Sequence, residues 1–427
     1  MPEVLDLAKA LPKSADVVVI GSGYTGLNAA LQTARGGRHT VVLEAGAPGA
    51  GCSTRNGGQI SSSIKPSLAA LTQRYGAERA RAIRGEGLAA LNWIEEFLEN
   101  EGIACDFRRT GRFHAAHTPR AFETIAKAAE KTMREEGVEA HSVSRSDQRS
   151  EIGSDHYFGG VVYPQFAQLH PGRYHRGLLD LAVKEGVQIV PYCPAQALSR
   201  DGKAHVIETP LGQLQARDVV VATNGYTTGL TPWLQRRVIP IGSYVIATEP
   251  LPPGMMDRLF PTRRIASDTR RVVYYYGPSP DGQRIVFGGR VSAGETDPRI
   301  SAPRLYAEMV RLFPELSKTK ISHSWSGTVA YTFDQLAHCG CEDGVYYAAG
   351  YCGSGVSMAS YLGMRTGLRV LGHPEGRSAF DDLPVPTRPF YTGKPWFLPT
   401  AVAWYRWRDQ LDCAIAHRNL ARRSPAT

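Results

Sequence analysis

The chain opens with two uninterrupted apolar runs separated by a helical pattern. The runs extend from Val17 to Ile20 and from Thr40 to Leu43, and both are rich in β-branched residues. Such runs are typical of parallel strands that are buried on both faces. Between them, apolar residues recur at helical spacing, namely Leu27, Ala30, Leu31 and Ala34. The pattern therefore predicts a strand, a helix and a parallel strand, the start of an α/β domain.

The turn between the first strand and the helix carries Gly21, Gly23 and Gly26, and the second strand ends at Glu44. In this GxGxxG arrangement the first glycine permits a tight turn, the second lets the backbone approach a pyrophosphate, and the third lets the helix pack closely on the sheet. The N–H groups of the helix start attract phosphate. The terminal acid accepts hydrogen bonds from a ribose and disfavours NADP. We predict a dinucleotide site that also includes Ser22, Tyr24, Thr25 and Ala45.

The segment from Ala45 to Ser63, called here the crossing segment, is polar and rich in glycine. Its composition alone is that of a flexible linker. The glycine motif does not by itself separate NAD from FAD. A nicotinamide-binding unit would continue to another strand at this place, whereas this chain has a long polar loop. Such a loop favours FAD, because the loop could wrap a second, larger ring system.

A second pattern of apolar residues lies far along the chain, in "RVVYYYGPSPDGQRIVFGGR". It predicts two strands around a Pro-Asp-Gly turn. Strand alternation places Tyr274 and Tyr276 on one face and Tyr275 on the other. Tyrosines in a sheet usually serve packing, yet Tyr276 and Arg290 are the preferred substrate-side candidates, because Arg290 could bind a carboxylate or phosphonate with two hydrogen bonds. Weaker candidates are Tyr244 and Trp325.

Composition restricts the class of protein. The chain has 427 residues, 42% of them hydrophobic and 21% charged, which predicts a soluble globular protein with two interleaved domains. The net charge is +9, but arginine pairs are scattered among acidic residues, so we expect a solvated surface rather than a nucleic-acid site. The N-terminus shows neither a signal peptide nor an anchor, and no apolar stretch is long enough to span a membrane. These features predict a cytoplasmic protein.

Cysteine usage argues against a disulfide framework and against a metal site. Seven cysteines are spread over the chain, which is an odd count in a long sequence. Cys339 and Cys341 form a lone CxC pair without the histidine or cysteine spacing of a zinc site. We expect no metal.

Several motifs together resemble the flavin-dependent amine and amino-acid oxidases of the D-amino-acid oxidase superfamily. They are "VVVIGSGYTGLNAALQTA", "VVLEAG", "GCSTRNGGQ", "VVVATNGYT", "RIVFGGR" and "GVYYAAGYCGSGVSMASYLG", and they cover most of the chain. The likeness is greatest to the gamma-glutamylputrescine oxidoreductase branch and smaller to sarcosine and glycine oxidases. It implies an α/β fold with a Rossmann-like, glutathione-reductase-like FAD-binding domain and an interleaved antiparallel-sheet substrate domain.

The resemblance also implies which residues bind FAD. The crossing segment would lie across the flavin, "VVVATNGYT" would close near the cofactor phosphate, and Ala195 would contact adenine. The helix start after "YYAAGYCGSG" would point at the flavin pyrimidine carbonyl and stabilise negative charge there. Relatives often have histidine where Ser354 stands. The residues implied are Cys52, Ser53, Thr54, Arg55, Asn56, Gly57, Gly58, Gln59, Thr223, Asn224, Gly225, Gly350, Gly353, Ser354, Gly355, Val356 and Ser357.

Two departures from the relatives affect the expected chemistry. Sarcosine oxidases attach flavin through a cysteine that would fall near Gly327, so dissociable FAD is expected, with Cys352 a remote alternative attachment point. The same relatives use a lysine to activate oxygen, and the corresponding position is Val286. Oxygen is the expected electron acceptor, but this substitution puts it in doubt.

The resemblance implies oxidation of an amine or amino acid by hydride transfer to flavin N5. The resulting imine hydrolyses, and reoxidation by oxygen yields hydrogen peroxide. No dedicated base is required where the pocket lowers the pKa of the amine. The alternatives are a dehydrogenase that passes electrons to a quinone or carrier protein, and a catalytically silent flavin-binding subunit. The positive net charge and Arg290 favour an amine substrate with an anionic group.

The domain organisation follows from the order of these motifs. We expect the FAD-binding domain to consist of residues 1–90, 151–235 and 325–375. Residues 91–150 and 236–324 should form the substrate domain, and residues 376–427 a C-terminal extension with a helix from about Pro399. A further helix is expected from Ser67 to about Leu98.

Overall fold

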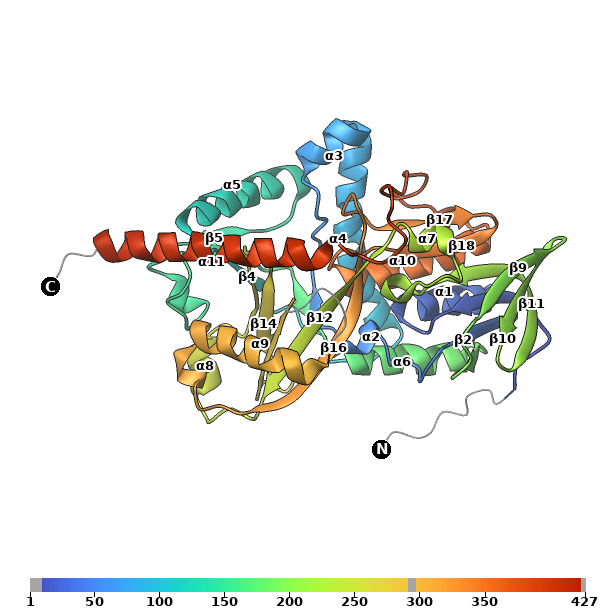
Figure 1. The fold of residues 1–427 in the computed structure, drawn as a ribbon, viewed down its shortest axis with the longest axis horizontal. Coiled ribbons are helices and arrows are strands. Elements are labelled where there is room, and N and C mark those ends of the chain that lie inside the picture. The colour runs from blue at the N-terminus through green and yellow to red at the C-terminus, as the bar shows by residue number, and fades with distance from the viewer. Residues whose placement is uncertain (1–9, 291–296, 424–427) are drawn as a thin grey trace.

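The computed structural model describes residues 10–290 and 297–423. Their strands form two eight-stranded sheets and one two-stranded ladder. Residues 1–9, which carry most of the N-terminal stretch where no signal peptide or anchor was expected, lie outside the described part. Figure 1 shows the two sheets at opposite ends of an elongated molecule, with helices α4 and α10 between them.

The first sheet is parallel at its centre. Its order is β17-β18-β11-β1-β2-β8, and the pairs among β18, β11, β1, β2 and β8 are all parallel. The central strands are buried on both faces, as the continuous apolar runs predict. The strands are β1 (Ser14–Ile20), β2 (Thr40–Leu43), β8 (Gln188–Val190), β9 (Ala197–Asp201), β10 (Ala204–Thr209), β11 (Gly212–Val221), β17 (His338–Glu342) and β18 (Val345–Ala349).

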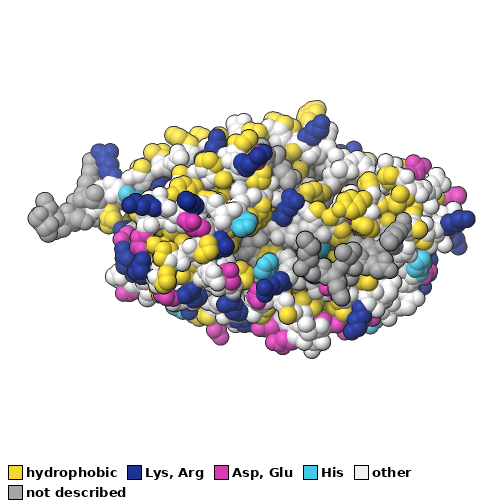
Figure 2. Space-filling view, turned by 90° about the horizontal axis from the view of Figure 1, so that it is seen from below, with side chains coloured by type: hydrophobic (Ala, Val, Ile, Leu, Met, Phe, Trp, Pro, Cys, Tyr) yellow, Lys and Arg dark blue, Asp and Glu magenta, His cyan; other side chains and the backbone are white. Residues whose placement is uncertain are grey.

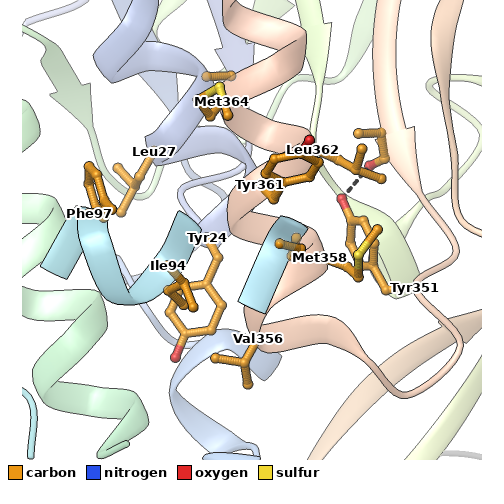
Figure 3. Packing of buried hydrophobic residues seen from close by; sticks show 14 of the residues in the cluster. Tyr24, Leu27, Ile94, Phe97, Tyr351, Val356, Met358, Tyr361, Leu362 and Met364 are labelled. Atoms are coloured by element: carbon orange, nitrogen blue, oxygen red, sulfur yellow. Dashed lines mark hydrogen bonds between the residues drawn. The ribbon is translucent and has the colours of Figure 1, made fainter. Parts of the chain in front are cut away.

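Helices α1 (Tyr24–Arg35) and α10 (Gly355–Val370) cross at very short distance. A Cβ atom on Gly363 would lie 2.4 Å from the carbonyl oxygen of Thr25, and one on Gly367 would lie 2.5 Å from that of Ala29. The glycines therefore let the two backbones touch. Figure 3 shows the apolar side chains that fill the surrounding core, drawn from α1, α10 and α4 (Ala77–Asn100).

Further helices surround this core. The expected helix from Ser67 to Leu98 is two helices, because Gly76 adopts φ +82° and interrupts it. These are α3 (Leu68–Tyr75) and α4, and the other helices of this half are α2 (Cys52–Arg55), α6 (Pro171–Lys184) and α7 (Pro232–Gln235).

The second sheet is mostly antiparallel, with one parallel pair between β13 and β4. One face packs on α8 (Met255–Leu259) and α9 (Pro298–Leu312) around a second apolar core. The other face is turned toward the crossing segment. The order is β16 (Ile321–Tyr331), β12 (Ile239–Thr248), β15 (Ile285–Gly289), β14 (Tyr274–Pro278), β13 (Ile265–Asp268), β4 (Arg112–Ala115), β6 (Gly160–Tyr163) and β5 (His141–Val143).

The expected domain limits differ from the observed sheets in two places. Strand β6 pairs with β4 and β5 in the second sheet, although residues from 151 onward were assigned to the cofactor domain. Strand β16 continues in the second sheet to Tyr331, beyond the expected limit at 325. Strand β6 is apolar and β16 is of mixed polarity, and the sheet that each joins is decided by pairing partners distant in sequence.

The remaining elements lie outside the two sheets. The C-terminal helix α11 (Leu398–Arg423) begins one residue before its expected start and crosses the second half of the molecule (Figure 1). The others are α5 (Pro119–Glu136) and the ladder of β3 (Gln59–Ile60) with β7 (Ala167–Gln168). Among the described helices, none is long and apolar enough to cross a membrane. On the face in Figure 2, basic and acidic side chains are interspersed.

Candidate functional site

Five parallel strands of the first sheet end at the same edge, and the predicted dinucleotide residues follow these ends. Strands β1, β2, β8, β11 and β18 lead to Gly21, Glu44, Ala195, Thr223 and Gly350, respectively. In open α/β sheets, ligands bind outside the carboxyl ends of the strands. The topology thus brings together residues from five distant parts of the sequence.

The glycine turn after β1 has no room for side chains. Gly21 adopts φ +104°, and a Cβ on Gly26 would lie 1.9 Å from the carbonyl oxygen of Gly21. A Cβ on Gly23 would lie 2.9 Å from the hydroxyl of Ser53. The turn therefore leaves its main chain open toward the crossing segment, which is the property that a pyrophosphate-binding turn requires.

Glu44 is held at the end of β2 by three hydrogen bonds. Its carboxylate accepts from the backbone N–H of Ser22 at 2.9 Å, from the Ser22 hydroxyl at 2.7 Å and from the N–H of Gly46 at 3.1 Å. Below it, Nε2 of His175 lies 2.7 Å from the Ser22 carbonyl oxygen, and burial lowers the pKa of this histidine. The acid is thus fixed beside the glycine turn, where a ribose would lie.

The side chains of Tyr24 and Thr25 point away from this edge. The Tyr24 hydroxyl donates to the carbonyl of Pro171 at 3.0 Å, and the Thr25 hydroxyl lies 2.6 Å from that of Tyr351. Both residues are buried. They can serve a cofactor only through their backbone, and the N–H of Tyr24 donates to the hydroxyl of Ser53 at 3.0 Å.

The crossing segment is ordered by its own polar residues. The Asn56 amide donates to the carbonyls of Cys52 and Ser53 at 3.2 and 2.8 Å, and its oxygen accepts from the N–H of Gly58 at 2.8 Å. The Thr54 hydroxyl donates to the Gly49 carbonyl at 2.5 Å. These bonds explain how a segment with the composition of a linker keeps one shape.

The second sheet holds the same segment from the other side. Nε1 of Trp325 donates to the Arg55 carbonyl at 2.9 Å, and the Arg55 guanidinium donates to the Ser326 carbonyl at 3.2 Å. The Gln59 amide lies 3.3 Å from the carbonyl oxygen of Ala266. The structure thus directs the charge of Arg55 to a carbonyl of β16 and makes Trp325 a positioning residue.

The loop after β11 is locked to the loop after β18. Asn224 adopts φ +44°, and its side-chain oxygen accepts from the N–H of Gly350 at 3.0 Å. The Thr223 hydroxyl lies 2.8 Å from that of Thr227. A Cβ on Gly225 would lie 2.7 Å from the Thr328 carbonyl, so the 3-10 turn lies directly against β16.

The start of α10 lies against the end of the crossing segment. The Ser354 hydroxyl donates to the Ser63 carbonyl at 2.7 Å, and the Ser357 hydroxyl lies 3.5 Å from the Ser61 carbonyl. Gly353 adopts φ +98°, and a Cβ on Gly355 would meet only open space. Val356 is buried in the core. The open backbone here is that of Gly353 and Gly355.

The arrangement fits a dinucleotide. Neither α1 nor α10 receives a hydrogen bond from its own N-cap side chain, a property that they share with α2, α4, α7 and α8. At the start of α1 the N–H of Tyr24 donates to Ser53 of the crossing segment. Uncapped helix starts offer N–H groups and positive dipole ends to an anion. With the ordered crossing segment between them, the two starts suit an elongated ligand with phosphate at one end and a polar ring at the other.

The two faces of the second sheet have opposite roles. Tyr276 and Tyr244 lie in the second apolar core, with 1% and 0% of their surface exposed, and the Tyr276 hydroxyl donates to that of Tyr157 at 2.8 Å. Alternation is as predicted, but it places these candidates away from the site. Tyr275 lies on the site face, where a Cβ on Gly57 would be 2.9 Å from its ring. Its hydroxyl lies 2.9 Å from that of Ser243.

Arg290 does lie on the site side, in a cluster that the sequence does not reveal. Its guanidinium lies 4.3 Å from the ring centroid of Tyr331 and donates to the Tyr331 hydroxyl. Nζ of Lys65 lies 5.2 Å from the same centroid. A Cβ on Gly353 would be 3.2 Å from the Tyr331 hydroxyl, which places the cluster beside the start of α10. We call Lys65, Arg112, Arg290 and Tyr331 the cationic cluster.

Arg112 extends this positive region along β4. It lies 3.4 Å from the Ser63 hydroxyl, and its buried Nε has no partner. Burial lowers its pKa to about 10. Other arginines form ion pairs, as Arg270 does with Asp268, but within residues 10–290 and 297–423 no member of the cluster pairs with a carboxylate. The region therefore carries positive charge that no acid of the described chain neutralises.

The described residues bear on metal binding and on flavin attachment through Cys352. The described residues include no group of three or more histidines, cysteines or acids that could hold a metal ion. The Cys352 thiol donates to the Gly350 carbonyl at 3.0 Å, and burial raises its pKa. This thiol is therefore held in its own loop in the unreactive, protonated form.

Known proteins resemble this chain in sequence and in fold. A gamma-glutamylputrescine oxidoreductase from Escherichia coli strain K12 is 31% identical over 401 residues, which cover 93% of each chain. A probable oxidoreductase, OrdL, from Haemophilus influenzae is 29% identical over 379 residues, 87% of this chain and 86% of that protein. The crystal structure of glycine oxidase from Geobacillus kaustophilus superposes with a TM-score of 0.75 at 19% identity, covering 88% of this chain and 99% of that one.

The family described as DAO, FAD dependent oxidoreductase, matches residues 16–367, which include both sheets and every loop of the site. The expected fold class and cofactor are thereby confirmed. The chain belongs to this family of FAD-dependent oxidoreductases, which act on amines or amino acids.

Proposed function

We propose that the protein oxidises an amine or amino acid at the carbon next to nitrogen, that the resulting imine hydrolyses, and that oxygen reoxidises the cofactor to give hydrogen peroxide. When bound, FAD supplies the two-electron acceptor. The relatives named above support this reaction type. The observation that carries the proposal is that the ordered crossing segment contacts two helix starts, α1 at Ser53 and α10 at Ser61 and Ser63.

The residues of the chain have separable tasks in this proposal. Glu44 would bind the ribose, the turn from Gly21 to Gly26 would bind the pyrophosphate, and the backbone at Gly353 and Gly355 would face the flavin. Tyr275 and Val286 would form the apolar wall on the second sheet, because they lie on its site face. Tyr275 and Val286 would orient the substrate carbon and exclude water.

The cationic cluster would keep the substrate amine neutral. A nearby positive charge disfavours the protonated form of an amine and lowers its pKa. Only a neutral amine has the electron pair needed for loss of hydride from the adjacent carbon. No carboxylate base is therefore needed.

The same cluster favours a substrate with an acidic group. Arg290 and Lys65 would bind a carboxylate or a similar anion, whereas a dication such as an unsubstituted diamine would be repelled. Steady-state kinetics with gamma-glutamyl or N-methyl amino acids and with diamines test this. Arg290→Gln and Lys65→Met should each raise KM for the acidic amine about tenfold, while Lys203→Met, on the remote β9–β10 turn, should not. Preference for diamines would refute the acidic-group proposal but not the reaction type.

FAD would be bound without a covalent link. Residue 327, where the attaching cysteine of sarcosine oxidases would fall, is a glycine, and Cys352 is engaged by its own loop. Acid precipitation of the purified yellow protein should leave all flavin absorbance in the supernatant. Flavin in the pellet would show covalent attachment.

Val286 favours an alternative in which the electron acceptor is not oxygen. This residue stands on β15 between Ala247 and Gly277, where a lysine would project toward the flavin in sarcosine oxidases. Electrons could instead pass to a quinone or carrier protein. To distinguish an oxidase from a dehydrogenase, the protein is reduced by substrate under nitrogen and air is then admitted. An oxidase regains its yellow colour within seconds and forms peroxide. A dehydrogenase stays bleached until a quinone is added. Absence of bleaching with every amine would refute both.

A further inference from the structure

Exposed apolar side chains are concentrated near the C-terminus. Of the twelve large hydrophobic side chains that are exposed among the described residues, seven lie between positions 390 and 415. Most soluble proteins scatter such residues singly, and a gathering of them marks an interaction surface. The seven are Phe390, Trp396, Trp404, Tyr405, Trp407, Leu411 and Ile415.

Helix α11 packs one side against the protein and exposes large apolar side chains on another. Its inner side carries Cys413 and Asp409, and the Asp409 carboxylate accepts from the N–H of Val272 at 3.0 Å, which fixes the helix to the second sheet. Its outer side carries residues spaced by three, four and four positions, which places them on one helical face. They are Trp404, Trp407, Leu411 and Ile415, and the first two rings lie 5.0 Å apart.

Cations outnumber acids along residues 388–418. The exposed or half-exposed cations of this stretch are Arg388, Lys394, Arg406, Arg408 and Arg418, and its acids are Asp409 and Asp412. Both acids of the helix are engaged in ion pairs. Asp409 and Asp412 accept from the Arg271 guanidinium at 2.9 Å, and the Asp412 carboxylate also lies 3.9 Å from the Arg408 guanidinium. The surface is therefore aromatic and cationic together, which we call the α11 surface (residues 388–418).

We propose that the α11 surface docks on an anionic phospholipid surface. Tryptophan and leucine on one helix face with arginines beside them are typical of helices that lie in the membrane interface, where the indole rings reach the headgroup level and the arginines meet phosphate. A second copy of the chain is a poorer occupant, because two identical cationic surfaces would repel each other. The proposal does not depend on the substrate or on the electron acceptor.

Sedimentation of the full-length, FAD-loaded protein with vesicles tests this proposal. Binding should be strong to phosphatidylcholine vesicles that contain about 30% phosphatidylglycerol and weak to phosphatidylcholine alone, and it should weaken as salt is raised. The double variant Trp404→Ser/Trp407→Ser should reduce partitioning about tenfold or more. A matched control is Leu211→Ser, which removes an equally exposed apolar side chain from the β10–β11 turn at the far end of the molecule.

Three results would overturn the proposal. They are absence of binding to both vesicle types, equal loss of binding in the Leu211→Ser control, and unchanged binding in the tryptophan variant. A concentration-dependent dimer in solution that the tryptophan variant abolishes would also overturn it, by showing that a second copy covers the α11 surface. Bound FAD and an unchanged melting temperature establish that each variant is folded.

Discussion

The indole of Trp325 donates a hydrogen bond of 2.9 Å to the backbone carbonyl of Arg55. Trp325 belongs to the second sheet and Arg55 to the crossing segment, so the bond joins the two halves of the molecule at the candidate flavin position. A Cβ on Gly327, two residues further along β16, would lie 3.3 Å from the Cys52 thiol. The second sheet would thus shape the proposed cofactor site as well as the proposed substrate wall.

Loss of this bond should loosen cofactor binding without unfolding the protein. In Trp325→Phe the ring remains but the donor is absent, and a single hydrogen bond contributes about 0.5–1.5 kcal/mol. We expect FAD to dissociate with a Kd raised roughly 2- to 10-fold. Flavin fluorescence on dilution measures this, and Trp404→Phe on the exterior is the control. An unchanged Kd would show that the bond has no role in holding the segment.

Glu44 should contribute more to cofactor affinity than any other single side chain of the site. Its carboxylate orders Ser22 and Gly46 and faces the expected ribose. Glu44→Gln keeps the size but removes the charge that strengthens these bonds, which are worth about 1.5–3 kcal/mol with a charged partner. The Kd for FAD should rise roughly 10- to 100-fold. Isothermal titration of the flavin-free protein measures it, and a rise below twofold would contradict the assigned role.

Two glycines in helices should respond oppositely to alanine. In Gly26→Ala the new Cβ would lie 1.9 Å from the Gly21 carbonyl oxygen, and we expect a loss of about 3 kcal/mol or more together with loss of FAD. In Gly85→Ala, on the exposed side of α4, the Cβ meets no atom within 4 Å, and we expect a gain of up to about 1 kcal/mol. Thermal unfolding compares them. Equal melting temperatures would contradict the close approach.

Acid should destabilise the protein well before its carboxylates are protonated. Burial, with Arg112 beside it and Lys65 and His117 nearby, lowers the pKa of His114 to about 3. In the unfolded chain a histidine has a pKa near 6.5, so below about pH 6.5 the unfolded state binds the proton and the native state does not. Stability is therefore present above this pH and is lost as pH falls toward 3.

The variant His114→Asn tests the contribution of this one residue. Its amide can replace Nδ1 opposite the Ser267 hydroxyl, which lies 2.9 Å from the ring in the native protein. Between about pH 7 and pH 5.5 the wild type should lose roughly 1 kcal/mol more than the variant. Urea unfolding at the two pH values measures this difference. Parallel losses in both proteins would show that His114 is not the titrating group.

The first strand, helix and second strand could be predicted from the sequence because their signals are local. The predicted strand Thr40–Leu43 is β2 without any change of limits. Local signals also gave the alternation of the three tyrosines from Tyr274 to Tyr276. They could not tell which face meets the crossing segment, because that depends on Gly57, more than two hundred positions earlier, against which Tyr275 packs.

The cationic cluster shows more clearly that contacts between residues far apart in the sequence cannot be predicted from local signals. Lys65 follows a serine run and resembles any exposed surface lysine. Its significance arises only when Tyr331, Arg290 and Gly353 are brought beside it from three later segments. The resemblance assigns Arg55 to the cofactor site, and its guanidinium donates to the Ser326 carbonyl of β16, a contact that its position in the sequence does not indicate.

The position of β18 in the chain has a consequence for biosynthesis. This strand pairs with β11 in the first sheet, yet every strand of the second sheet precedes it. A ribosome must therefore release nearly the whole polypeptide before Gly350 can meet Asn224, and cofactor capture follows translation of both halves. Chains that terminate early would leave Val219–Val221 of β11 unpaired on this side, and an unpaired strand edge favours recognition by chaperones and proteases.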